Sequence, residues 1–305
     1  MLDIHDLSIS FTQYQAGLRQ KNMAMISNLS LSAKKGEILA VVGSSGSGKS
    51  LLAHAVLGIL PKNATMTGNI LYKGEPLTLE RQKTLRGKEI ALIPQSVNFL
   101  DPLMRVGHQV RKTARKNIAR NVQKKVFERY KLHSRAERLF PFQLSGGMAR
   151  RVLVSTAVVG RAELIIADEP TPGLHLEVVH ETLNHLRELA DEGCAVVLIT
   201  HDIGMVTDVA DHIAVFYAGT VVEVAPAGDF KEEGRHLRHP YTRALWHALP
   251  QNGFVPIPGS QPCQHDLPPG CLFEPRCHKK TPACAEMIPP MQELRSGKVR
   301  CIHAT

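Results

Sequence analysis

A glycine-rich stretch of the chain has the spacing of a phosphate-binding loop. It reads Gly-Ser-Ser-Gly-Ser-Gly-Lys-Ser, a complete G-x-x-x-x-G-K-S pattern. One apolar run at 38–42 precedes it and another at 51–53 follows it, which predicts a strand, a turn and a helix. In such a loop, successive N–H groups surround a polyphosphate at the positive end of the helix. The residues predicted to bind nucleotide are Gly43, Ser44, Ser45, Gly46, Ser47, Gly48, Lys49 and Ser50.

Two side chains of this loop have separate roles in that interpretation. Lys49 would reach the β- and γ-phosphates, and the Ser50 hydroxyl would be a ligand of Mg²⁺. An ordinary Gly/Ser-rich loop is the alternative, but the flanking strand and helix patterns argue against it.

Acidic and imidazole side chains follow two later apolar runs. The run at 164–167 is suited to a buried parallel strand and ends in Asp168 and Glu169. Ligands of open α/β sheets bind at the carboxyl ends of strands, so we expect Asp168 to hold Mg²⁺ and Glu169 to orient the attacking water. The run at 194–199 is followed by His201, which could reach the γ-phosphate. A histidine after a strand is more often a structural surface residue.

A Leu-Ser-Gly-Gly sequence at 144–147 lies between these motifs and precedes a helix-like stretch. The start of a helix is another anion-binding position, but this one is too far along the chain to serve the same phosphate easily. With this motif the chain resembles the ATP-binding cassette (ABC) family. The motifs stand in the family's order over roughly residues 1–230.

The resemblance implies roles that spacing alone does not give. Ser145, Gly146 and Gly147 would cap the γ-phosphate of an opposite subunit, so that two chains enclose two ATP molecules. Gln95 would be the glutamine that lies beside Mg²⁺ and senses the nucleotide, and His201 would be the switch histidine.

The aromatic residue that stacks on adenine is less clearly marked in the sequence. Phe11 is the predicted residue because it lies just after the first strand-like stretch, and Tyr14 is its substitute.

Length and composition agree with this interpretation. The chain has 305 residues, of which 43% are hydrophobic and 21% charged, enough for one large domain and a small one. No run approaches the roughly 18 apolar residues that a membrane helix needs, and the acidic start lacks a signal peptide pattern. We therefore expect a protein of the cytoplasm that binds peripherally to the cytoplasmic face of the membrane.

The net charge of +9 comes from one segment, 105–131, which has ten Lys and Arg residues and one acid. Its apolar residues recur at every fourth position, which predicts two helices in place of one straight helix. In the family this helical subdomain faces the transmembrane partner. A solvated basic face is one interpretation, and contact with an acidic permease loop or anionic lipid is the other. DNA binding is weaker, because no nucleic-acid module accompanies the charge.

The composition changes after about residue 250. Ten of the nineteen prolines and five of the six cysteines fall in 250–305, which indicates a loop-rich appendage that does not continue the sheet. Cysteines of a cytosolic chain are poor disulfide candidates, and a small segment of this kind needs a metal or another staple. Four of them are separated by five, six and sixteen residues, without paired C-x-x-C knuckles.

This segment resembles the C-terminal extension of importers for oligopeptides, dipeptides and nickel. The similar sequences are His-Pro-Tyr-Thr-Arg-Ala-Leu at 239–245 and the stretch 268–277. The resemblance implies a four-iron, four-sulfur cluster, with zinc as the alternative. The implied ligands are Cys271, Cys277, Cys284 and Cys301, whereas Cys263 has no assigned role.

The sequence thus predicts an α/β fold with a P-loop, a mixed sheet and an inserted helical subdomain at about 96–160. We expect a nucleotide-binding domain at 1–235 and the extension at 236–305. The expected function is ATP hydrolysis that powers an importer of peptides or nickel chelates, with two permeases and an extracytoplasmic binding protein. The alternative is a soluble ABC ATPase that acts on nucleic acid or ribosomes.

One position departs from the family pattern. His175 stands where relatives have the aspartate of the D-loop, which crosses the dimer interface. A histidine cannot reproduce a fixed carboxylate, and its charge varies near neutral pH. We therefore expect a heterodimer with a second, different ATPase subunit.

Overall fold

The computed structural model describes residues 1–14, 20–44, 46–114, 118–160, 162–264 and 266–305. The chain forms two compact units. The first contains residues 1–33, 39–77 and 201–305, and the second contains residues 34–38 and 78–200.

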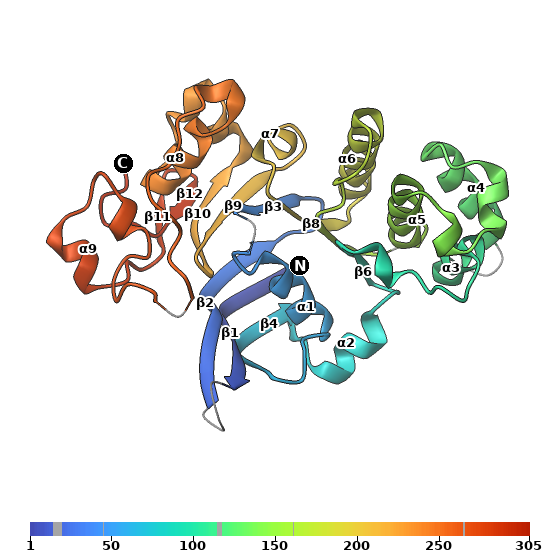
Figure 1. Ribbon diagram of the computed structural model, residues 1–305, viewed down its shortest axis with the longest axis horizontal. Helices are drawn as coiled ribbons and strands as arrows, with labels where there is room; N and C mark the ends of the chain where they lie inside the picture. Colours follow the sequence, from blue (N-terminus) through green and yellow to red (C-terminus); the bar gives the residue numbers. More distant parts are fainter. Residues whose placement is uncertain (15–19, 45, 115–117, 161, 265) are drawn as a thin grey trace. The chain divides into compact units, whose positions relative to one another are not determined.

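The first unit holds two groups of strands and several short helices (Figure 1). Its elements are β1 (Leu2–Tyr14), β2 (Gln20–Ala33), β3 (Ile38–Gly43), α1 (Lys49–Leu57), β4 (Ala64–Tyr72), β5 (Glu75–Pro76), α7 (Ile203–Val206), β9 (His212–Tyr217), β10 (Thr220–Pro226), α8 (Pro240–His247), α9 (Pro282–Glu286), β11 (Gln292–Leu294) and β12 (Gly297–Val299).

The strands β2, β1, β4 and β5 form an antiparallel sheet in that order. A bulge in β1 keeps its apolar residues on one face: Leu2 and Ile4 are buried before it, and Leu7 and Ile9 after it. Asp6 forms the bulge with a φ of 50°. The buried residues of β1 therefore change from even-numbered to odd-numbered positions, and they stay on the face that packs into the core.

The second strand group of this unit has the order β11, β12, β10, β9 and β3. β3 pairs with β9 in parallel, and β9 pairs with β10 in an antiparallel hairpin, which confirms the predicted mixed sheet. Ala218 and Gly219 turn the hairpin with φ angles of 46° and 91°, as a two-residue turn between twisted strands requires. β12 then pairs with β10, so the C-terminal segment extends this sheet, and the prediction that it does not continue the sheet was wrong.

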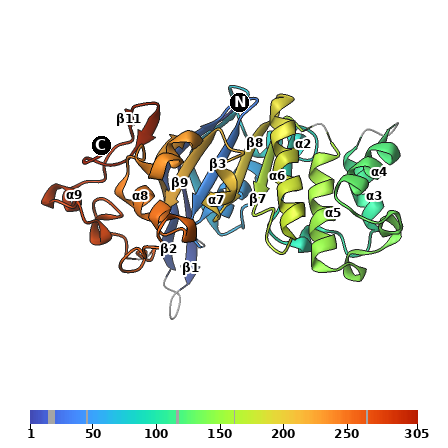
Figure 2. The same ribbon diagram turned by 90° about the horizontal axis from the view of Figure 1, so that it is seen from above.

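The second unit carries three parallel strands, β6, β7 and β8, and most of the long helices. Its elements are α2 (Leu79–Leu85), β6 (Ile90–Ile93), α3 (Val106–Thr113), α4 (Ala119–Arg129), α5 (Gly146–Val158), β7 (Leu164–Asp168), α6 (Leu176–Asp191) and β8 (Ala195–Thr200). Every residue of β7 and β8 is buried, as expected of parallel strands covered on both faces. Helices α6, α5 and α4 follow one another in both views (Figures 1 and 2).

The basic segment confirms the prediction of two helices, since α3 ends at Thr113 and α4 begins at Ala119. Among the described residues, no helix combines the length and apolar character that would let it cross a bilayer.

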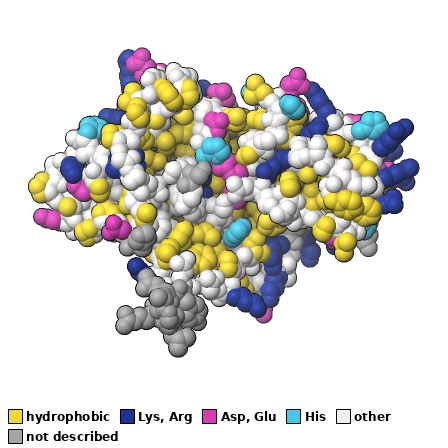
Figure 3. Space-filling view, viewed as in Figure 1, with side chains coloured by type: hydrophobic (Ala, Val, Ile, Leu, Met, Phe, Trp, Pro, Cys, Tyr) yellow, Lys and Arg dark blue, Asp and Glu magenta, His cyan; other side chains and the backbone are white. Residues whose placement is uncertain are grey.

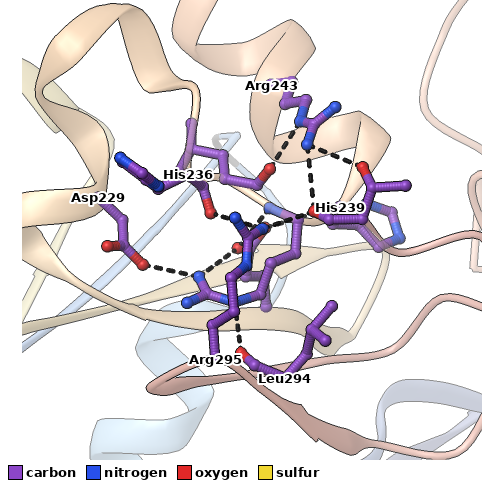
Figure 4. Close-up of polar contacts among 10 residues, drawn as sticks. Asp229, His236, His239, Arg243, Leu294 and Arg295 are labelled. Carbon is purple, nitrogen blue, oxygen red and sulfur yellow. Dashed lines mark hydrogen bonds and ion pairs between the residues drawn. The ribbon is translucent and has the colours of Figure 1, made fainter.

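A buried carboxylate joins the C-terminal segment to β10, and Figure 4 shows polar contacts of this region, including those of Asp229 and Leu294. Glu223 lies on β10 and accepts hydrogen bonds of 2.8 Å from the amides of both Arg238 and His239. The Arg238 guanidinium donates to Glu223, to Asp229 at 2.7 Å and to the Leu294 carbonyl at 2.7 Å. Glu223 is fully buried and Arg238 is almost fully buried. Water cannot solvate either charge, and each is neutralised by the other.

A variant without the Arg238 guanidinium should therefore unfold at a lower denaturant concentration than the wild type. We expect Arg238→Ala to lower the free energy of unfolding by about 3–5 kcal/mol, because Glu223 would remain buried without its counter-ion. Urea unfolding of the full chain, followed by circular dichroism, measures this. The matched control is Arg235→Ala, which breaks an exposed pair with Glu233 and should change stability by less than about 1 kcal/mol. Equal losses in both variants would contradict the argument.

Candidate functional site

The phosphate loop has the predicted form of strand, turn and helix. β3 ends at Gly43 and α1 begins at Lys49, with Gly48 as the N-cap residue. Gly46 and Gly48 have φ angles of 76° and 102°, which residues with a side chain rarely adopt. Gly43 is required for a different reason, because a Cβ there would lie 2.4 Å from the Phe216 carbonyl oxygen. The predicted residue Ser45 lies outside the described residues.

Lys49 occupies the interior of this loop. Its side chain is buried, and Nζ donates to the carbonyl oxygens of Gly43 at 2.9 Å and Ser44 at 2.8 Å. Ser47 is buried beside it, whereas Ser50 is half-buried in the first turn of α1. The ammonium group thus lies among oxygen acceptors, which is the environment that phosphate oxygens would also provide.

The acids at the end of β7 are both buried in the second unit. Asp168 is 3% exposed and Glu169 is 6% exposed. The Glu169 amide donates to the Ile199 carbonyl at 2.9 Å, and Thr200 Oγ1 lies 3.5 Å from Glu169 Oε2. Glu169 has a φ of 47°, a left-handed backbone that costs a non-glycine residue energy and is typical of functional sites.

Arg150 is a residue of this site that the sequence analysis missed. It lies on α5, is 7% exposed, and donates to the Pro94 carbonyl at 2.9 Å. Burial lowers the pKa of Arg150, and the charges of Glu169 and Asp168 act in the opposite direction. The second unit therefore brings the two acids, a buried guanidinium and the residue before Gln95 into one electrostatic neighbourhood. Its position in the helix directly after the Leu-Ser-Gly-Gly motif was the only signal in the sequence.

Gln95 and His201 are exposed residues at strand ends. Gln95 follows Pro94 directly after β6, and His201 follows β8. Asp202 then begins α7, and its Oδ1 accepts a hydrogen bond from the Met205 amide at 3.2 Å. Both residues lie just after the end of a strand, and their roles stay predictions.

The Leu-Ser-Gly-Gly motif forms the start of α5. Ser145 is the N-cap residue, and its hydroxyl accepts a hydrogen bond from the Met148 amide at 3.3 Å. Gly146 is exposed, with no atom within 4 Å of the position that a Cβ would take. Gly147 follows it in the first turn. The helix start is thus open to an anion that approaches from outside, in agreement with the predicted helix-terminus site.

Phe11 lies on β1 and is half-buried, with Met23 and Ala64 opposite it on the neighbouring strands. Its role in adenine stacking stays a prediction. The side chain of its substitute, Tyr14, lies outside the described residues.

The four cysteines of the C-terminal segment line one small cavity. Burial raises the pKa of Cys271 to about 11, and it also raises the pKa values of Cys277 and Cys301. The Cys301 sulfur accepts a hydrogen bond of 3.3 Å from the His303 amide. Cys263 is exposed and does not line the cavity.

A histidine with an unsatisfied nitrogen also lines this cavity. His239 Nδ1 accepts a hydrogen bond from the Tyr241 amide, and its buried Nε2 has no hydrogen-bond partner. Burial lowers the pKa of His239 to about 3, with the Arg300 backbone acting in the opposite direction. The ring is therefore neutral and carries its proton on Nε2. In the described parts of the chain, no three His, Cys, Asp or Glu side chains lie close enough to hold one metal ion.

The basic segment is partly neutralised within the second unit. Arg129 pairs with Glu181 at 2.6 Å and Glu188 at 2.7 Å, and Arg111 pairs with Glu137 at 3.3 Å. Other basic side chains of the segment remain exposed, and Figure 3 shows such a dark-blue group where Figure 1 has α3 and α4. Among the described residues of the segment, the exposed basic side chains are those of Arg105, Lys112, Arg120, Lys124, Lys125 and Lys131, and Lys131 pairs with Glu177.

A groove of about 300 Å³ lies between β6, the chain that follows it, and α3 and α5. Leu92, Leu100, Met104 and Leu153 line it, together with Phe99, which is 55% exposed. Exposed aromatic and aliphatic side chains around a groove are typical of a protein-binding surface.

Known proteins are similar to this chain over nearly its whole length. Residues 26–172 match the ABC transporter family, and residues 222–284 match the C-terminal region of oligopeptide/dipeptide transporters. The dipeptide transport ATP-binding protein DppD of Escherichia coli (strain K12) is 34% identical over 322 residues, which cover 99% of this chain and 96% of that protein. The oligopeptide transport ATP-binding protein OppD of Salmonella typhimurium is 33% identical over 318 residues, which cover 98% and 92%.

Solved structures agree in fold. A dimeric ATP-binding cassette in a post-hydrolysis state, bound to ADP and Pi, matches with a TM-score of 0.65 and 24% identity. The match covers 74% of this chain and 99% of that one. At this identity the likeness shows the fold alone.

The buried position of Glu169 gives a direct test of its role. We expect Glu169→Gln to slow ATP hydrolysis by about 10²–10⁴-fold, because an amide of similar shape cannot accept the proton of the attacking water. Binding of MgATP should change by less than about two-fold. Phosphate release and equilibrium binding measure the two effects in the protein assembled with its partners.

The matched control for that variant is Glu177→Gln on α6, which removes an exposed ion pair with Lys131. It should hydrolyse ATP at the wild-type rate. Near-normal hydrolysis by Glu169→Gln would show that another group positions the water.

Proposed function

Since this chain belongs to the ATP-binding subunits of the oligopeptide and dipeptide ABC transporters, we propose that it powers the import of small peptides. The observation that carries the proposal is identity of 33–34% over nearly the whole length of such subunits, including their C-terminal region. The reported relatives are transport proteins, so the alternative of a soluble ATPase acting on nucleic acid or ribosomes is outweighed. Nickel chelates are the alternative cargo.

The residues of the nucleotide site would divide the chemistry as follows. Lys49 and the amides of the phosphate loop bind the polyphosphate, and Ser50 and Asp168 supply the oxygen ligands that Mg²⁺ prefers, with Gln95 beside them. Bound Mg²⁺ would neutralise charge that develops on the phosphate oxygens. Glu169 accepts the proton of the attacking water, and His201 donates to the γ-phosphate.

The open start of α5 supports a head-to-tail dimer, because Ser145 and the two glycines would bind a phosphate carried by another subunit. We propose that this subunit is a different ATPase. His175 is the N-cap residue of α6 and makes no side-chain capping hydrogen bond, although aspartate is favoured at that position. A partner with the aspartate would leave the two ATP sites unequal.

Two surfaces of the second unit would join the protein to a membrane complex. The groove beside Phe99 has the size and apolar walls to hold part of a permease helix, and the exposed basic side chains of α3 and α4 suit acidic permease loops or lipid headgroups. We propose that two permease subunits hold the protein at the cytoplasmic face and that an extracytoplasmic binding protein delivers cargo. The division into a nucleotide-binding domain and an extension at about residue 235 belongs to the same proposal.

For the C-terminal cavity we propose an iron–sulfur cluster held by Cys271, Cys277, Cys284 and Cys301. The His303 amide, which donates to the Cys301 sulfur, and the unsatisfied Nε2 of His239 are donors that suit thiolates and sulfides. A single zinc requires four sulfurs within about 2.3 Å of one point. A four-iron group spreads its four thiolate ligands over several metal ions, and zinc held by the same cysteines stays the alternative.

The transport proposal is tested by uptake into cells. A strain that lacks this chain should lose most energised uptake of a radiolabelled dipeptide, and wild-type protein should restore it, whereas Lys49→Ala should not, because the polyphosphate loses its buried cation. Uptake of a nickel chelate should be unchanged. Loss of nickel uptake alone would assign the other cargo, and no loss of either would argue against an importer.

The same cells test the partner proposal. Complexes purified through this chain should contain one copy of it, one different ATPase and two permeases. An active complex with two copies of this chain would contradict the heterodimer.

The cluster proposal is tested by composition. Protein purified without oxygen should be brown and contain about four iron and four sulfide ions per chain, because each thiolate would hold one iron. Cys277→Ser should lower both contents, whereas the matched control Cys263→Ser should not. A colourless protein with one zinc would support the alternative metal.

A further inference from the structure

The C-terminal segment makes a hydrogen bond to the phosphate loop. Ser44, the second residue of the loop, donates through Oγ to Gln261 Oε1 at 2.6 Å, and the two residues are 217 positions apart. Both belong to the first compact unit. Gln261 lies in the proline-rich stretch after α8, which the sequence alone did not connect with nucleotide binding.

A second residue of the C-terminal segment reaches the same serine. The Tyr241 hydroxyl lies close enough to the Ser44 side chain for the two groups to interact. Tyr241 is 2% exposed, and its ring packs against Tyr217 at 4.4 Å and Phe273 at 5.3 Å between ring centroids. Its amide donates to His239 at 3.0 Å. Tyr241 therefore has little freedom, and its hydroxyl is a fixed partner for Ser44.

These contacts complete the fixation of one residue of the loop. The Ser44 carbonyl accepts a hydrogen bond from Lys49 Nζ, while the Ser44 side chain donates to Gln261 and lies near the Tyr241 hydroxyl. A glycine-rich loop has many backbone conformations when it is unsupported. Restraint of Ser44 from both its main chain and its side chain reduces that number before nucleotide binds, and affinity rises when a binding loop is pre-organised.

We propose that Gln261 and Tyr241 are positioning residues of the phosphate loop, so that the C-terminal segment raises the affinity of the chain for MgATP. The inference rests on the proposed function, because MgATP is its ligand. Neither side chain acts on the reacting atoms. Their loss should therefore weaken nucleotide binding and leave the rate of hydrolysis at saturating ATP near that of the wild type.

The experiment measures the dissociation constant of the full-length chain for MgATP by titration calorimetry, and KM and kcat in the assembled complex. Gln261→Ala should weaken binding about three- to ten-fold, the range that loss of one net hydrogen bond produces. Tyr241→Phe keeps the ring and removes only the hydroxyl, so it should also weaken binding. In both variants KM should rise while kcat changes by less than about two-fold.

A double variant separates positioning from general stability. Ser44→Ala alone should weaken MgATP binding, and Gln261→Ala added to it should cause no further loss, because the shared hydrogen bond is already absent. The matched control is Gln264→Ala in the same stretch, whose buried amide has no hydrogen-bond partner and which should bind MgATP normally.

Wild-type affinity in both Gln261→Ala and Tyr241→Phe would overturn the inference. So would a loss of affinity by Gln261→Ala that is equally large in the Ser44→Ala background, since that result indicates a general defect. Failure of the wild-type chain to bind MgATP would instead refute the proposed function.

Discussion

The carboxylate of Glu223 determines the course of the C-terminal half of the first unit. It is fully buried on β10, and it accepts the amides of Arg238 and His239 just before α8 begins. This fixes where α8 starts and which way it runs. Arg238 then reaches the Leu294 carbonyl and so ties the last strands to the same point. A buried ion pair adds little stability compared with apolar packing, but it specifies one arrangement because any other leaves a charge unpaired.

Several features of the molecule follow from that arrangement. His239, the N-cap residue of α8, lines the cysteine cavity. Tyr241 lies in the first turn of the same helix, and its hydroxyl is near Ser44 of the phosphate loop. Phe273 lies two residues after Cys271, and its ring packs against the rings of His239 and Tyr241. The cavity and the phosphate loop are therefore supported by neighbouring side chains of one short helix. The C-terminal segment is integrated with the sheet and is more than an appendage.

The sequence predicted the local structure around the phosphate-loop and strand-end motifs well, because these motifs encode backbone geometry. Glycines with positive φ, a buried lysine and acids at a strand end each have a local physical cause that a single stretch reveals. Contacts between distant segments have no such local signal. Arg150 was missed because a basic residue in a helix is usually exposed, and the link from Gln261 to Ser44 joins residues 217 positions apart. The sequence correctly predicts two helices in the basic segment. It does not reveal that Glu181 and Glu188 of α6 neutralise Arg129, because these acids lie more than 50 positions away.

Gly43 belongs both to the phosphate loop and to strand β3 of the sheet. Its backbone is ordinary, but β3 and β9 approach so closely there that a methyl group would meet the Phe216 carbonyl. Replacement by alanine would push β9 sideways, and the displacement would pass along the hairpin to β10 and the strand that pairs with it. A genetic screen would score such a variant as unable to use ATP, although its primary lesion would be a misaligned sheet. The first glycine of the motif thus serves the architecture of the sheet before it serves the phosphate.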